Sequence, residues 1–83
     1  MLKIDNALDT NFATPYKLLG MVYFKTGRLV EARQNFLHAL ELNPNYAGAI
    51  LGMAYVRYAE GKPKEAMSYV EQAIGKGATL EQL

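Results

Sequence analysis

Few side chains in this sequence are suited to nucleophilic or acid–base chemistry. The 83 residues include a single histidine, His38, a single serine, Ser68, and no cysteine. A serine–histidine–carboxylate triad would have to use both of these residues. Each lies off the apolar stripe of the helix predicted to contain it, as solvated side chains do. We therefore expect His38 and Ser68 to be surface residues, and we expect the protein not to be an enzyme.

The sequence supports metal binding and paired-carboxylate catalysis no better than it supports a catalytic triad. One histidine without cysteine does not make a transition-metal site. Asp5 and Asp9, spaced i, i+4, could be ligands or an acid–base pair, but such a pair is more often a solvated helix face with mild repulsion. The Gly48-x-x-x-Gly52 pattern lies outside any membrane-length apolar segment, so these glycines are expected to permit close helix contact or peptide access. No metal and no cofactor are predicted.

Composition and charge exclude several classes of protein. Hydrophobic residues make up 51% of the chain and charged residues 20%, which excludes intrinsic disorder. The formal net charge of +1 and the mixing of basic with acidic residues argue against a nucleic-acid partner. No apolar run approaches the length of a membrane span, and the N-terminus does not resemble a secretory signal. A cytoplasmic protein with no membrane insertion is expected.

An internal repeat with a 34-residue period organises the chain. Sliding the sequence along itself by this offset superposes Gly27 on Gly61 and Ala39 on Ala73. A competing match, Leu-Gly-Met-x-Tyr at residues 19–23 and again at residues 51–55, requires a two-residue deletion and a two-residue insertion. The 34-residue offset requires neither, so we prefer it. Repeats of this length indicate stacked supersecondary units.

Each unit has the pattern of a helix, a short turn and a second helix. Thr14-Pro15 predicts an N-cap followed by the first helical position, and Gly27 predicts the end of that helix. Further helices are expected over about 29–42, 47–60 and 63–74, and no strand is predicted. The inner stripe of the first helix is expected to comprise Tyr16, Leu19, Gly20 and Tyr23.

These residues resemble the tetratricopeptide repeat, a 34-residue helix–turn–helix. Residues 13–46 meet every signature position: Tyr16, Leu19, Gly20, Tyr23, Gly27, Ala32, Phe36, Ala39 and Pro44. Residues 47–80 match more loosely, with Arg57 where an aromatic belongs and Ala78 where the proline belongs. The resemblance implies an all-α fold of antiparallel helix–turn–helix repeats stacked as a short right-handed α-solenoid. Residues 1–12 would be a partial N-terminal helix or cap, and residues 81–83 the start of a truncated C-terminal helix.

In that family, ligands bind a concave face lined by the first helix of each unit, which implies a scaffold that binds a peptide or protein segment. Mapped onto this sequence, the groove residues are Lys17, Met21, Phe24, Lys25, Leu51, Tyr55 and Tyr58. Met21 stands where the family's carboxylate clamp has asparagine, so the resemblance does not extend to that clamp. The groove instead suits an apolar segment with some acidic residues. Alternatively, its aromatic residues pack as core.

A second function follows from the small number of repeats. Stacked arrays normally need about three units for stability, because each unit must bury its apolar face on a neighbour. The outer face of the last helix is therefore expected to remain partly uncovered, leaving Met67, Tyr69, Val70 and Ile74 available. The alternative function is structural self-assembly, either as a homo-oligomer or as part of a longer array.

Overall fold

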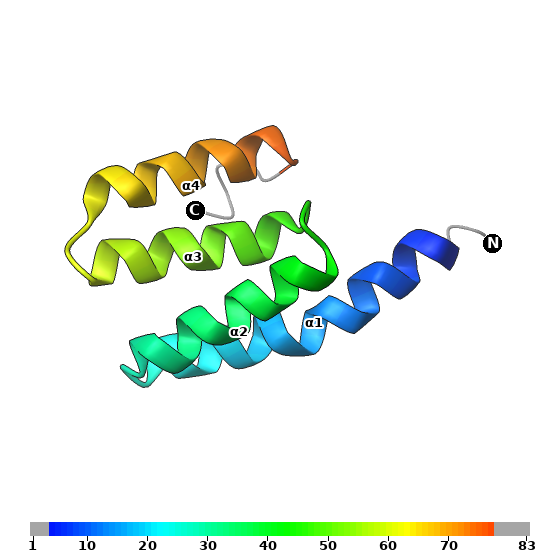
Figure 1. Ribbon diagram of the computed structural model, residues 1–83, viewed down its shortest axis with the longest axis horizontal. Coiled ribbons are helices and arrows are strands. Elements are labelled where there is room, and N and C mark those ends of the chain that lie inside the picture. Colours follow the sequence, from blue (N-terminus) through cyan, green and yellow to red (C-terminus); the bar gives the residue numbers. More distant parts are fainter. Residues whose placement is uncertain (1–3, 78–83) are drawn as a thin grey trace.

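The computed structural model describes the backbone of residues 4–77 and the side chains of residues 12–77. Four helices and no strand lie within this range, namely α1 (Ile4–Lys25), α2 (Leu29–Leu42), α3 (Ala47–Ala59) and α4 (Pro63–Gly75). They form two antiparallel hairpins, α1 with α2 and α3 with α4, that stack through α2 and α3 (Figure 1). The predicted all-α fold of stacked helical hairpins is confirmed.

The two hairpin turns have the same structure. Gly27 and Gly61 each have a φ of 83°, in the left-handed region that glycine accepts without a Cβ clash. In each turn the amide after the glycine donates a hydrogen bond to the carbonyl four residues before the glycine, at 2.8 and 2.9 Å. The turn at Gly27 thus maps onto the turn at Gly61 without insertion or deletion, which agrees with the preferred 34-residue offset.

The first helix begins earlier than the sequence predicts. α1 is continuous from Ile4 to Lys25 and contains Pro15, so the predicted start at Thr14 and a separate N-terminal helix are wrong. A proline inside a helix removes one backbone hydrogen bond. Packing holds the helix at this point, because the neighbouring Ala13 is fully buried in a cluster with two alanines of α2 and α3. The predicted start of a C-terminal helix at residues 81–83 lies outside the described residues.

Phe36 is the centre of the core. It is 1% exposed and clusters with Ala32 of its own helix and with Met53 and Val56 of α3. Its ring fills the space beside two glycines, Gly20 of α1 and Gly52 of α3. A Cβ atom at Gly20 would lie 2.8 Å from the ring carbons Cδ1 and Cε1, and a Cβ atom at Gly52 would lie closer still. The expected role of Gly52 in close helix contact is therefore seen, with Phe36 as the contacting group.

Leu19 does not face the core as predicted. Its side chain is 45% exposed, whereas Met53, its equivalent in the second hairpin, is fully buried. Both residues have the same place in their hairpins. The difference arises because α2 covers α3 at Met53, and no described helix covers α1 at Leu19.

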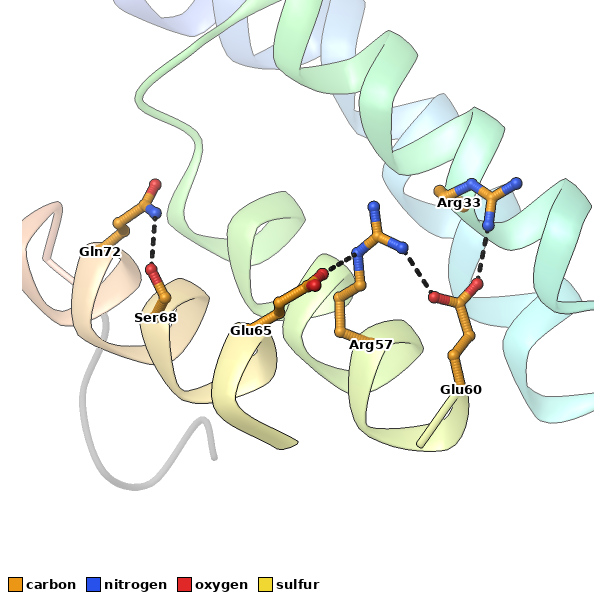
Figure 2. A network of polar contacts seen from close by, with 6 residues as sticks. All are labelled: Arg33, Arg57, Glu60, Glu65, Ser68 and Gln72. Carbon is orange, nitrogen blue, oxygen red and sulfur yellow. Dashed lines mark hydrogen bonds and ion pairs between the residues drawn. The ribbon is translucent and has the colours of Figure 1, made fainter. Parts of the chain in front are cut away.

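A polar network occupies the place of the aromatic that the second unit lacks (Figure 2). Glu60, which follows α3, accepts hydrogen bonds from Arg57 at 2.8 Å and from Arg33 of α2 at 2.7 Å. The Nε of Arg57 also lies 3.5 Å from Oε1 of Glu65 in α4, an ion-pair contact. The hydrogen bond to Glu60 raises the pKa of the Arg57 guanidinium above its ordinary value. The network therefore links three helices, α2, α3 and α4.

Replacing Glu60 with alanine should lower the free energy of unfolding by about 1–3 kcal/mol, because two partly buried guanidinium groups lose their shared acceptor. Urea denaturation followed by circular dichroism measures this loss. Glu41→Ala is the control, since Glu41 is 78% exposed and 3.9 Å from His38, and a change below about 0.5 kcal/mol is expected there. Equal, small losses in both variants would show that the network does not stabilise the hairpin junction.

Candidate functional site

α1 presents different stripes of side chains in different directions, because a helix turns by about 100° per residue. One stripe packs into the hairpin and includes the buried residues Ala13 and Gly20. A second stripe, rotated away from the first, carries the side chains Lys17, Met21, Phe24 and Lys25. This second stripe contains all four groove residues that the sequence placed on the first helix.

A cavity of about 320 Å³ lies between this stripe and α3. Six of the seven predicted groove residues line it, and they are Lys17, Met21, Phe24, Lys25, Leu51 and Tyr55. The seventh, Tyr58, is 70% exposed and does not line the cavity. Pockets of about 300–1,000 Å³ are typical of ligand sites, so the volume suffices for one or two side chains of a partner.

The predicted groove omitted three of the lining residues, Phe36, Gly48 and Gly52. Phe36 is both a core residue and part of the cavity lining. The two glycines form the Gly48-x-x-x-Gly52 pattern, which is the feature of the sequence that could have indicated their place in the cavity lining. The Phe36 ring occupies the space beside Gly52, and the Lys17 side chain lies beside Gly48, so the pattern allows close packing around the cavity.

An aromatic pair joins the two sides of the cavity. The rings of Phe24 in α1 and Tyr55 in α3 have centroids 5.9 Å apart and an interplanar angle of 32°. Phe24 also packs against the Phe36 cluster, which agrees with the alternative that the groove aromatics belong to the core. Tyr55 is 39% exposed. The pair therefore forms a wall that is anchored in the core on one side and open to solvent on the other.

The cavity carries positive charge and no negative charge among its lining residues. The Lys17 side chain lies beside the start of α3. A Cβ atom placed at Gly48 would be 3.4 Å from the Cε of Lys17, and the Nζ of Lys17 is 6.0 Å from the centre of the Tyr46 ring. Lys25 is exposed at the other end of the stripe. The two lysines are eight residues apart in one helix, which places their backbones about 12 Å apart along its axis.

The residues considered for catalysis are not brought together. The ring of His38 stacks on Tyr16 with centroids 4.0 Å apart, and Ser68 accepts a hydrogen bond from Gln72 at 3.4 Å (Figure 2). Neither residue lines the cavity. The side chains of Asp5 and Asp9 lie outside those described. Within the described part of the chain, no three histidine, cysteine, aspartate or glutamate residues are grouped to hold a metal ion.

Comparison with known proteins agrees with the repeat and its turns. The family model described as Tetratricopeptide repeat matches residues 13–46. Residues 13–46 are a tetratricopeptide repeat. A relative, the uncharacterized protein ycf37 of Pyropia yezoensis, is 36% identical over 72 residues, which cover 83% of this chain and 40% of the relative. The chain thus spans less than half of that relative's length. No solved structure matches the chain.

Tetratricopeptide repeats generally mediate protein–protein interactions and are generally non-catalytic scaffolds. The matched repeat, residues 13–46, comprises most of α1 and all of α2. It supplies the lysine-bearing side of the cavity and Phe36, and α3 supplies the opposite side. Of the helices described, none is long and apolar enough to cross a membrane.

Proposed function

We propose that this tetratricopeptide repeat protein binds a peptide or protein segment in the cavity between α1 and α3. The observation that carries the proposal is an open, largely apolar cavity with an aromatic wall, Phe24 and Tyr55, and two lysines on one side. Tyrosine, phenylalanine and methionine are enriched at the centres of protein interfaces. Met21 adds a flexible side chain that adapts to different apolar groups.

The chemistry of the cavity defines the partner segment. Its apolar part supports binding of one or two aliphatic or aromatic side chains. Lys17 and Lys25 favour acidic residues on either side of them, because their charges face no acidic lining residue. A separation of about 12 Å between the lysine backbones corresponds to about four residues of an extended segment or eight of a helical one. The expected motif is therefore an apolar centre flanked by carboxylates.

Selection of short random peptides on the immobilised 83-residue chain tests this motif directly. Selected peptides should share an apolar or aromatic centre with flanking acidic residues. Tyr55→Ala should weaken binding of such a peptide at least about tenfold in isothermal titration calorimetry, because half of the aromatic wall is removed. The Lys17→Gln, Lys25→Gln double variant should abolish the preference for acidic residues and the dependence of affinity on salt.

Tyr58→Ala is the matched control, because it removes the same side chain from the same helix outside the cavity. We expect the peptide affinity of this variant to stay within about twofold of the wild type. An equal loss in the Tyr55 and Tyr58 variants would place the binding surface on the outside of α3. Selection of peptides without acidic residues would contradict the role given to the lysines.

Self-assembly is the second candidate, and exposed apolar side chains on α4 favour it. Of the predicted self-association face, Met67 and Ile74 are largely exposed, at 57% and 46%. Tyr69 and Val70 are half-buried because they pack inward against α3 and its neighbours. The apolar surface available on α4 is thus narrower than the sequence predicts, and it is centred on Met67 and Ile74.

A further inference from the structure

A third stripe of α1 is apolar and uncovered. Leu18, Leu19 and Val22 are 45–57% exposed, and none of them lines the cavity or belongs to a core cluster. Their equivalents in the second hairpin are Gly52, Met53 and Val56, all buried. α2 covers those equivalents, with Phe36 against Gly52 and in one cluster with Met53 and Val56. The face of α3 that is buried against α2 therefore has an equivalent face on α1, and this equivalent face is exposed.

α4 carries the other half of the same interface. On α2, the residues that meet α3 include Ala32, Arg33, Phe36 and Leu40. Their equivalents in α4, one repeat later, are Ala66, Met67, Val70 and Ile74. Met67 and Ile74 are exposed on this face. Met67 and Ile74 of α4 therefore lie on a face equivalent to the α2 face that is buried against α3.

The two uncovered faces complement each other in size. In the interface between α2 and α3, a large side chain, Phe36, lies against a residue without one, Gly52. At the equivalent positions, α4 has the smaller Val70 and α1 has the larger Leu18. The smaller side chain at position 70 offsets the larger one at position 18 in this register, and Val70 offers only the part of its side chain that does not pack against α3.

The two faces also match in charge. The Arg33–Glu60 ion pair spans α2 and the end of α3 at 2.7 Å. At the equivalent positions α4 has Met67 and α1 has Thr26, both uncharged. Burial of an unpaired charge would be costly. Stacking α4 on α1 in this register buries no such charge at this position, because both residues there are uncharged.

We propose that α4 of one copy packs on α1 of a second copy in the register in which α2 packs on α3. This inference deepens the self-assembly candidate and rests on it, and it is independent of peptide binding in the cavity. The interface is heterologous, because a different face is used on each copy. Copies stacked in this way extend the array head to tail, so association grows with concentration and has no closed dimer as its end point.

Charged substitutions on the two exposed faces test the proposal by sedimentation velocity of the whole chain at increasing concentration. Val22→Glu blocks the α1 face and Met67→Glu blocks the α4 face, and each side chain is 57% exposed, so both variants should fold. Each variant alone should be monomeric, with association weakened at least about tenfold. A mixture of the two variants should form a one-to-one heterodimer and nothing larger, because one unmodified α4 face and one unmodified α1 face remain.

Leu37→Glu is the matched control, because Leu37 is an exposed apolar residue of α2 and its equivalent in α4 is already Glu71. This variant should associate like the wild type. Self-association of either single charged variant, or failure of the mixture to pair, would overturn the assigned faces while leaving self-assembly standing. A wild-type chain that stays monomeric at high concentration would overturn both. Peptide binding to the cavity, measured on the same samples, should be unchanged.

Discussion

Replacing Phe36 with alanine should unfold much of the population of this chain at room temperature. The ring is 1% exposed and contacts the positions of Gly20 in α1 and Gly52 in α3, so its removal opens a cavity where three helices meet. Phenylalanine-to-alanine substitutions in cores cost about 3–5 kcal/mol. At about 0.05–0.15 kcal/mol per residue, a chain of this length has a stability of about 4–12 kcal/mol, and two stacked hairpins should lie at the lower end of this range.

The measurement is urea denaturation of the variant, followed by circular dichroism in the far ultraviolet. Leu37→Ala is the control, since Leu37 is on the same helix and is 43% exposed. We expect this variant to lose much less free energy of unfolding than Phe36→Ala. If the two substitutions lowered the midpoint equally, Phe36 would not be the residue that holds the two hairpins together.

Replacing Gly52 with alanine should destabilise the chain, although alanine is the better helix former by about 1 kcal/mol. The added Cβ would overlap the ring of Phe36, which is held on its other side by α1 at Gly20. Overpacking of this kind costs typically about 1–3 kcal/mol. We expect the steric term to prevail, with a net loss of up to about 2 kcal/mol in the free energy of unfolding.

Gly75→Ala is the matched control for this second prediction. An added Cβ at Gly75, the last residue of α4, has no atom within 4 Å, so helix propensity acts alone and the variant should be slightly stabilised. In a Phe36→Leu background, Gly52→Ala should cost less than in the wild type, because the smaller side chain leaves room. An unchanged cost would mean that the ring is not the source of the strain.

The cavity and the proposed junction occupy separate stripes of α1, so the two functions can be tested separately. Tyr55 belongs to the cavity and Val22 to the uncovered face. Tyr55→Ala should therefore affect peptide affinity only, and Val22→Glu should affect association only. Head-to-tail stacking would also continue the line of first helices from one copy to the next, which would set their cavities side by side along one array.

The amino-acid sequence by itself determined the helices, the turns and the repeat, because these depend on properties of individual residues. Gly27 and Gly61 supply the left-handed backbone that ends a helix. Six of the seven groove residues predicted from the repeat register do line one cavity, because the register states which face of each helix a side chain occupies. The chemistry available on that face, apolar with two lysines, is likewise a property of the sequence.

Only the tertiary structure decided which equivalent positions are buried. Leu19 and Met53 have the same place in the repeat, yet one is 45% exposed and the other is fully buried, because burial depends on whether a neighbouring helix covers the position. Pro15 predicts a helix start locally, but the buried alanine cluster beside it keeps α1 continuous. The position of the Phe36 ring between Gly20 and Gly52 also depends on tertiary structure, because these residues belong to three helices of two hairpins that meet only in the folded chain.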